Sequence, residues 1–290
     1  MLKIAILDDY QNVSKKFGNW EKLEKKINLK VFNEFIPNKN ILVKNLLDFD
    51  VVCLMRERTK FGKDIISKLP NLKLVITSGN WNPSVDQIEL NKRKIYFCGT
   101  GNKIQSTAEL SWLLIMNVWR NISTEFDNMK NNKWQTTIGR TLYGKTLGIF
   151  GLGKQGKQVA KFGKAFGMDV IAWSHNLSKK QCDREGVKLV TSNDLFKFSD
   201  ILTIHTKLSD RTRDFIDKKK FSLMKKSSII INTSRGPIIK EKDLIFAIRN
   251  NIISGAGLDV YDTEPLPKNH DLRTLMKQFN VLLTPHVGYV

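Results

Sequence analysis

The sequence predicts an α/β protein built on parallel sheets. Short apolar runs of strand length recur along the chain and alternate with helical or irregular segments, an alternation typical of parallel sheets. One of these runs leads into closely spaced glycines and then into a helical segment, as at the ligand sites of many α/β proteins. The 290 residues, 41% of them hydrophobic, are enough for two domains with cores of their own, or for one large domain.

Five strands are predicted in the first hundred residues. They lie at residues 3–7, 29–32, 51–55, 72–77 and 94–98. Because helical or irregular connections separate them, we expect them to form one parallel sheet.

A long helix is predicted next. Ser106 and Glu109 have the spacing of a capping box at its start. The apolar residues of the segment recur at helical spacing and form a wide face, made of Leu110, Trp112, Leu113, Leu114, Val118 and Ile122. We expect this helix to be buried and to bridge two domains.

Six further strands are predicted after a polar stretch at residues 128–140. They lie at residues 146–150, 170–173, 201–205, 228–232, 254–259 and 281–284. No repeat or low-complexity segment interrupts this second α/β series.

The glycines that follow the first strand of this series have the spacing G-x-G-x-x-G. Gly151 would permit a tight turn, Gly153 would let the backbone approach a pyrophosphate, and Gly156 would let the next helix pack closely on the strand. Backbone amides at the start of that helix, including those of Lys154 and Gln155, would hold the phosphates. A tight turn without a ligand is the alternative, but the strand before the motif and the amphipathic helix after it favour a Rossmann dinucleotide site.

The composition narrows the classes of partner. A formal net charge of +20 raises nucleic acid as a partner, but the lysines form dispersed short clusters without an aromatic-rich stripe. Solvated helix faces explain them better, so no nucleic acid is expected. No apolar run reaches the roughly 18 residues of a membrane span, and the N-terminus is charged too soon for a signal peptide. We therefore expect a cytoplasmic protein without membrane contact.

The three cysteines argue against a disulfide framework. Cys53, Cys98 and Cys182 are odd in number and far apart. This pattern favours reduced thiols over a disulfide or a zinc site, and no metal is expected.

Three polar residues follow strands of the second series, where ligands bind in open parallel sheets. They are Arg235, Glu264 and His286. Taken one at a time, each has an ordinary alternative: a surface cation, an acidic loop residue and a structural histidine.

Taken together, these segments resemble the D-isomer-specific 2-hydroxyacid dehydrogenase family along nearly the whole chain. The resemblance rests on four segments that occur in the family's order, at residues 144–156, 232–236, 257–265 and 284–288. It implies a flavodoxin-like substrate-binding domain at 1–100 and a Rossmann NAD(P)-binding domain at 101–290 that includes the bridging helix, with the active site between them. The implied reaction is reversible reduction of a small 2-oxo acid, such as glyoxylate or hydroxypyruvate, to the D-2-hydroxy acid.

The resemblance also implies the catalytic roles. Arg235 would bind the carboxylate and carbonyl of the substrate, His286 would be the acid/base, and Glu264 would pair with His286. These residue types suit the chemistry, because hydride transfer to C2 develops negative charge on the carbonyl oxygen, which needs a cation and a proton donor. A carboxylate beside the imidazole would fix its tautomer and raise its pKa.

A loop of the first domain resembles the family's carboxylate-binding loop. Gly79 and Asn80 are the candidates in it. Arg56 and Arg58 could approach the distal end of the substrate, and surface arginines are the equal alternative.

Further residues are implied at the cofactor. Thr107 would lie near the nicotinamide unless it only caps its helix, and Asp259 would bind the carboxamide unless it is a buried structural carboxylate. The remaining candidates of this group are Thr206, Ser234 and Gly288. Family members commonly dimerise through this domain, so a homodimer is expected, with Trp112 and Trp119 either at that surface or in the core.

The second strand of the Rossmann series departs from the NAD pattern. It ends in Ser174, His175 and Asn176, whereas an NAD-specific site has an Asp or Glu there for the ribose hydroxyls. These side chains could hydrogen-bond a 2′-phosphate, and Lys179 or Lys180 could neutralise it. NADPH is therefore slightly favoured, although the lysines could equally belong to a solvent-facing loop.

The end of the sequence is a second departure. Family members usually continue past the segment of His286 with a helix that returns to the first domain, whereas this sequence stops at Val290. We therefore expect the first domain to lack its return segment, and the protein to be less stable or less active than a longer form.

A function of another class stays open, because some relatives of this fold are NAD(H)-sensing corepressors that bind without turnover. Intact Arg235, Glu264 and His286 favour the enzyme, whereas the high positive charge and the missing C-terminal segment keep the sensor open as the alternative.

Overall fold

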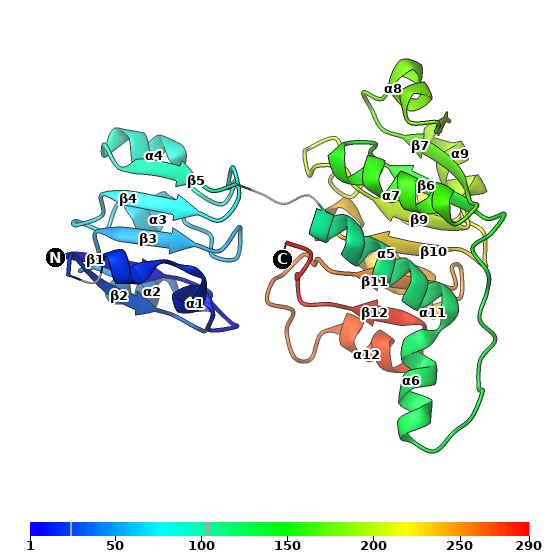
Figure 1. Cartoon of the computed structure of the whole chain (residues 1–290), viewed down its shortest axis with the longest axis horizontal. Coiled ribbons are helices and arrows are strands. Elements are labelled where there is room, and N and C mark those ends of the chain that lie inside the picture. The colour runs from blue at the N-terminus through cyan, green and yellow to red at the C-terminus, as the bar shows by residue number, and fades with distance from the viewer. Residues whose placement is uncertain (24, 102–104, 290) are drawn as a thin grey trace. The chain divides into compact units, whose positions relative to one another are not determined.

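The computed structural model describes residues 1–23, 25–101 and 105–289 and contains two compact units, Met1–Asn102 and Lys103–Val290 (Figure 1). Each unit is a parallel sheet with helices, as the sequence predicts. Among the described residues, no helix is both long and apolar enough to cross a membrane.

The first unit contains a five-stranded parallel sheet in the order β2-β1-β3-β4-β5. This order confirms the predicted flavodoxin-like architecture. The strands are β1 (Leu2–Ile6), β2 (Ile27–Val31), β3 (Val51–Leu54), β4 (Leu74–Thr77) and β5 (Tyr96–Gly99). The helices are α1 (Ser14–Phe17), η1 (Trp20–Leu23), α2 (Lys39–Leu46), α3 (Lys63–Ile66) and α4 (Gln87–Lys92).

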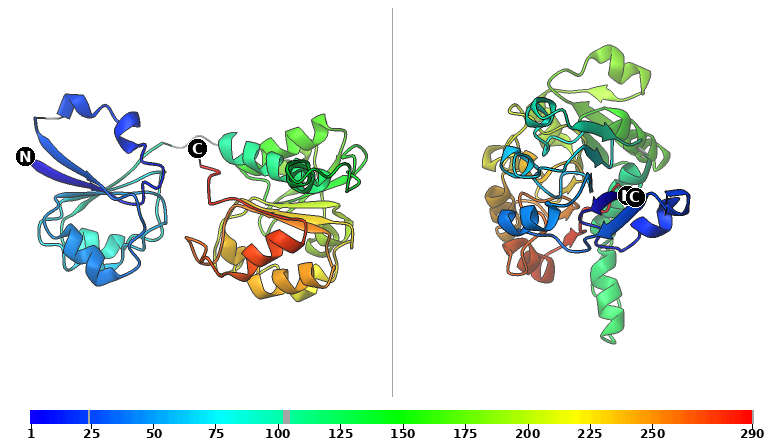
Figure 2. Two further views of the ribbon diagram at one scale, coloured as in Figure 1. Left: turned by 90° about the horizontal axis from the view of Figure 1, so that it is seen from below. Right: turned by 90° about the vertical axis from the view of Figure 1, so that its left-hand side faces the viewer.

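The core of this unit lies on one face of the sheet. Ala5, Val52 and Val75 alternate with residues of the other face and are fully buried. They pack against apolar side chains of α2, α3 and α4, among them Leu46 and Ile66. Figure 2 (left) shows these helices grouped on that face.

The second unit contains a seven-stranded parallel sheet in the order β12-β11-β10-β9-β6-β7-β8. Counted within the unit, this is the Rossmann order with one strand added at the far edge, and the order reverses between β6 and β9. The strands are β6 (Thr146–Phe150), β7 (Asp169–Trp173), β8 (Lys188–Leu189), β9 (Ile201–Ile204), β10 (Ile229–Asn232), β11 (Gly255–Leu258) and β12 (Val281–Leu283). The sequence predicts all of these except the two-residue β8.

Helices cover both faces of this sheet, and a separate core lies on each side (Figure 2, left). One face carries α5 (Gln105–Arg120), α7 (Lys154–Ala165) and α8 (Lys179–Arg184). The other carries α9 (Ser192–Phe198), α10 (Lys218–Phe221), α11 (Glu241–Arg249) and α12 (Asp271–Gln278). The mostly apolar strands β9 and β10 are buried at every position because both faces of the sheet are covered.

The helix predicted to run through Ile122 is two helices. α5 ends at Arg120 because Asn121 takes a left-handed conformation, with φ of 56°, and α6 (Ile122–Lys130) begins after it. Ser106 lies inside α5, which begins at Gln105, so the predicted capping box is wrong. Ile122 is exposed, so the buried face ends earlier than predicted.

Trp119 belongs to the core of its own unit. Only 1% of it is exposed, and its Nε1 donates to the carbonyl of Thr141 at 2.9 Å. The guanidinium of Arg140 lies over its ring, 3.6 Å from the centroid. Trp112 packs against Phe162 on α7, so neither tryptophan offers a large exposed surface.

Candidate active site

The glycine motif forms a cradle with little space for side chains. Gly151 has φ of 103°, and a Cβ there would lie 2.8 Å from the backbone of His205 and of Thr206. A Cβ at Gly156 would lie 2.2 Å from the carbonyl oxygen of Gly151, so α7 approaches the end of β6 without room for a methyl group. No atom lies within 4 Å of the corresponding point at Gly153. Gly151 and Gly156 therefore leave no room for a side chain, whereas the space beside Gly153 is empty and fits a pyrophosphate.

The first turn of α7 is available to an anion. Gly153 is the N-cap of this helix, and no side chain caps it. The amides of Lys154, Gln155 and Gly156 therefore begin the helix without a side-chain acceptor from the cap, as helix N-termini that bind phosphate do.

The loop after β7 carries the residues predicted to meet the ribose. The His175 ring packs against Trp173 and Phe215, with centroid distances of 4.9 and 5.4 Å. Burial lowers the pKa of His175, and the nearby positive charge of Arg211 lowers it further. With the Asn176 amide oriented so that its oxygen faces Arg211, that oxygen accepts from Arg211 Nη2 at 3.3 Å.

Arg211 is a residue that the sequence analysis missed. It lies in the loop after β9, whereas Lys179 and Lys180, the predicted cations, form the first turn of α8 as exposed residues. The strand order could have pointed to Arg211, because the loops after β7 and β9 both flank the glycine loop after β6.

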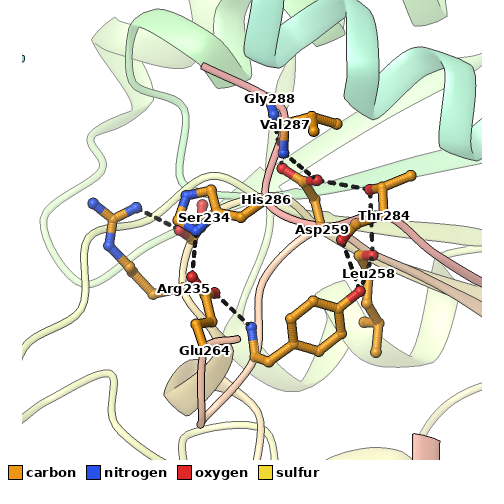
Figure 3. A network of polar contacts seen from close by, with 10 residues as sticks. Ser234, Arg235, Leu258, Asp259, Glu264, Thr284, His286, Val287 and Gly288 are labelled. Carbon is orange, nitrogen blue, oxygen red and sulfur yellow. Dashed lines mark hydrogen bonds and ion pairs between the residues drawn. The ribbon is translucent and has the colours of Figure 1, made fainter. Parts of the chain in front are cut away.

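The turn after β10 positions Arg235. The side chain of Asn232 accepts from Ser234 N at 3.0 Å and donates to Arg235 O at 2.9 Å. The Ser234 hydroxyl donates to the carbonyl of Ile204 at 2.8 Å, so this candidate for the cofactor already has a partner on β9. Arg235 is half-buried, and its Nη1 donates to Ser234 O at 2.7 Å (Figure 3).

Glu264 and His286 come from separate loops and meet directly. His286 Nδ1 lies 2.6 Å from Glu264 Oε2, and the other carboxylate oxygen accepts from Tyr261 N at 3.0 Å. Their side chains are only 21% and 24% exposed. Because Nδ1 is engaged by the carboxylate, Nε2 is the ring nitrogen left to exchange a proton with a substrate. Figure 3 shows Arg235 beside this pair.

Asp259 fixes the turn that carries His286. Its Oδ1 accepts from Thr284 Oγ1 at 2.7 Å and from Val287 N at 2.8 Å, and its Oδ2 accepts from Gly288 N at 2.9 Å (Figure 3). The residue is 1% exposed, and this burial raises the pKa of Asp259. These contacts are what a buried structural carboxylate makes, the alternative that the sequence left open.

The predicted residues Thr107 and Gly288 also contact each other. The Thr107 hydroxyl donates to the Gly288 carbonyl, which ties α5 to the end of the His286 loop. Ser111 extends this link, because its hydroxyl lies 2.7 Å from that of Thr233 at the end of β10. No sequence pattern marks Ser111, a small polar residue on a mostly apolar helix.

The candidates in the first unit lie at the carboxyl ends of its strands. Gly79 has φ of 94°, and its amide donates to Thr100 Oγ1 at 2.9 Å, so that amide already has an acceptor. A Cβ at Gly79 would lie 2.6 Å from Arg56 Nη1, so Arg56 lies against this loop. Asn80, the next residue, is exposed.

Arg58 is directed elsewhere in the first unit. Its Nη1 donates to the carbonyl of Asp8 at 2.6 Å, and its guanidinium lies 4.4 Å from the centroid of the Tyr10 ring. The two arginines are therefore not equivalent: Arg56 meets the loop after β4, and Arg58 meets the loop after β1.

The described residues include no group of three or more His, Cys, Asp and Glu placed to hold a metal ion.

Comparison with known proteins gives consistent matches. The profile of the family "D-isomer specific 2-hydroxyacid dehydrogenase, NAD binding domain" matches residues 112–288. A hydroxypyruvate reductase from Thermotoga maritima is 35% identical over 269 residues, which cover 92% of this chain and 86% of that protein. A D-3-phosphoglycerate dehydrogenase from Methanocaldococcus jannaschii is 37% identical over 254 residues, or 86% of this chain. This chain spans about half of that longer relative, 48% of its length.

Solved structures give the same result. A phosphoglycerate oxidoreductase from Vibrio cholerae matches with a TM-score of 0.93 and 34% identity, covering 100% of this chain and 93% of that one.

Proposed function

Because this chain belongs to the D-isomer-specific 2-hydroxyacid dehydrogenase family, we propose that it reduces a small 2-oxo acid to the D-2-hydroxy acid with NAD(P)H. The observation that carries the proposal is the His286–Glu264 contact of 2.6 Å beside Arg235, at the edge of the sheet that carries the glycine cradle. Glyoxylate and hydroxypyruvate are the substrates to test first, because one similar protein is named glyoxylate reductase and another hydroxypyruvate reductase.

The residues of the second unit suit the two demands of this reduction. When bound, the nicotinamide cofactor would supply the hydride for C2 of the substrate. Arg235 would hold the substrate carboxylate and carbonyl with its two-pronged guanidinium, and its charge would stabilise the negative charge that develops on the carbonyl oxygen. His286 would then donate its Nε2 proton to that oxygen.

Glu264 would control the orientation of this acid. Its carboxylate accepts from Nδ1, so the imidazole keeps one ring position and presents Nε2. In the oxidation direction, neutral His286 would take the hydroxyl proton at the same nitrogen, and Glu264 would stabilise the imidazolium that forms.

Residues of the first unit would recognise the rest of the substrate. We assign carboxylate binding to the loop of Gly79 and Asn80, with Asn80 as the stronger donor because the Gly79 amide already donates to Thr100. Arg56 lies against this loop and would contact the distal end of the substrate.

A homodimer is part of the proposal. The apolar side chains of α6 and the following segment are widely exposed, with Phe126 at 59%, Met129 at 54% and Trp134 at 75%. Contact with a second copy would bury them, and light scattering of the purified protein measures the mass directly.

The test is the absorbance of NADH and NADPH with a panel of 2-oxo acids. We expect turnover in the wild type and a loss of about 100-fold to 10,000-fold in kcat/KM for His286→Ala and Arg235→Ala, with cofactor binding retained. His270→Ala is the matched control, because among the described residues His270 also contacts a glutamate, with its Nε2 3.1 Å from Glu241 Oε1, and this change should leave turnover unchanged. Cofactor binding without turnover of any substrate would reject the enzyme and support the sensor.

A further inference from the structure

Two loops flank the glycine cradle. β6 lies between β7 and β9 in the sheet, so the loops that leave the carboxyl ends of β7 and β9 lie on either side of the glycine loop. The β7 loop carries His175 and Asn176, and the β9 loop carries Arg211.

The β9 loop has a fixed backbone around Arg211. The hydroxyl of Thr212, 4% exposed, donates to Lys207 O at 2.8 Å and accepts from Ser209 N at 2.8 Å. Arg213 N donates to Ser209 O at 2.8 Å. Arg211 therefore leaves a closed turn, and little of its backbone freedom remains to be lost on binding a ligand.

The β7 loop is held against the same turn. Phe215, four residues after Arg211, packs on His175 and stacks on Trp173, with centroid distances of 5.4 and 5.3 Å. In the amide orientation that satisfies both of its neighbours, Asn176 links the two loops by accepting from Arg211 Nη2 at 3.3 Å, and it donates to His175 O of its own loop at 3.2 Å.

We infer that Arg211 and His175 form a binding site for the phosphate on the 2′ position of the cofactor ribose, and that Arg211 decides between NADPH and NADH. The adenosine ribose of a Rossmann site lies at the end of the second strand, here β7. Residues 174–176 contain no acid to repel a phosphate, and an exposed guanidinium can bind it with two parallel hydrogen bonds. The inference deepens the proposed function but needs only a nucleotide at the glycine cradle, not turnover.

A ligand pair isolates this interaction from catalysis. Adenosine 2′,5′-bisphosphate and adenosine 5′-monophosphate differ only in the 2′-phosphate, and calorimetric titration measures the affinity for each. We expect the wild type to prefer the bisphosphate by about tenfold or more. Arg211→Met should abolish this preference and leave the affinity for the monophosphate within about twofold.

The control is Arg213→Met, which removes the same charge two residues away on the same loop and should keep the preference. Equal weakening of both ligands by Arg211→Met would show that Arg211 only holds Asn176, and would overturn the inference. An unchanged preference in Arg211→Met would also overturn it.

Kinetics separate this inference from the proposed function. If the protein turns over 2-oxo acids, the ratio of kcat/KM for NADPH to that for NADH should fall about tenfold or more in Arg211→Met. If it turns over none of them, the two titrations still decide the role of Arg211.

Discussion

An added methyl group should affect a different property at each of the two glycines that follow Gly151, stability at Gly156 and nucleotide binding at Gly153. Gly156→Ala places a Cβ 2.2 Å from the carbonyl oxygen of Gly151, and an ordinary contact of 3.4 Å requires a displacement of about 1.2 Å between α7 and the end of β6. Gly153→Ala places its Cβ where no atom lies within 4 Å. The first substitution should therefore reduce stability, and the second should reduce nucleotide binding.

The magnitudes follow from these distances. Overpacking against a rigid backbone atom costs up to about 3 kcal/mol, and alanine regains about 1 kcal/mol of helix propensity over glycine. A net loss of about 2 kcal/mol lowers Tm by roughly 4–8 °C in a protein of this size. For Gly153→Ala we expect a Tm within about 2 °C of the wild type and a Kd for NADH about tenfold higher or more, or about 1.4 kcal/mol.

Thermal unfolding by circular dichroism and titration of NADH fluorescence measure the two effects on the same samples. A wild-type Tm for Gly156→Ala would contradict the close contact of α7 with Gly151. Unchanged NADH binding by Gly153→Ala would mean that no pyrophosphate passes next to it.

Three further results are expected. Asp259→Asn replaces an acceptor of backbone amides with an NH2 group and should cost about 1–3 kcal/mol of stability and lower kcat/KM, because the turn that carries His286 loses its anchor; wild-type kcat/KM would contradict this role. Burial and neighbouring carboxylates raise the pKa of Asp262 to about 6, so its contribution to stability is largest below pH 4 and is lost as the pH rises through 6. Asp262→Asn should therefore flatten the decline of Tm between about pH 4 and 6, and an unchanged slope would count against it. A thiol reagent at pH 8 should modify only Cys98 in the native protein, since Cys182 is buried and burial raises the pKa of the Cys53 thiol to about 11; rapid reaction of two thiols without denaturant would refute this.

The fold was largely predictable because its signals are local. Strands buried on both faces, such as β9 and β10, are mostly apolar runs, and the glycine motif marks the turn after β6. Errors arose where one residue changed the backbone. Asn121 ends α5 through its left-handed conformation, which apolar spacing on either side does not reveal.

The candidate site was predictable only in part, and its residue roles stay predictions. Glu264 and His286 each follow a strand, and the structure brings them into contact. Asp259 accepts hydrogen bonds from Thr284, Val287 and Gly288 in the loop after β12. These contacts depend on the register between β11 and β12, which the spacing of residues in the sequence does not determine. Arg211 was missed for a similar reason, because its neighbour Asn176 is distant in sequence and meets it only through the strand order.

The strands of the second unit are parallel, so the loops that carry the candidate residues all leave the same edge of the sheet. The proposed chemistry uses no residue at the opposite edge. Lys226, exposed just before β10, lies at that opposite edge. Covalent attachment of the protein to a bead or an electrode through this amine would leave the nucleotide cradle and the His286 turn open to dissolved reactants. Because the parallel strands place the reactive groups at one edge of the sheet, the opposite edge is suited to immobilisation of the protein.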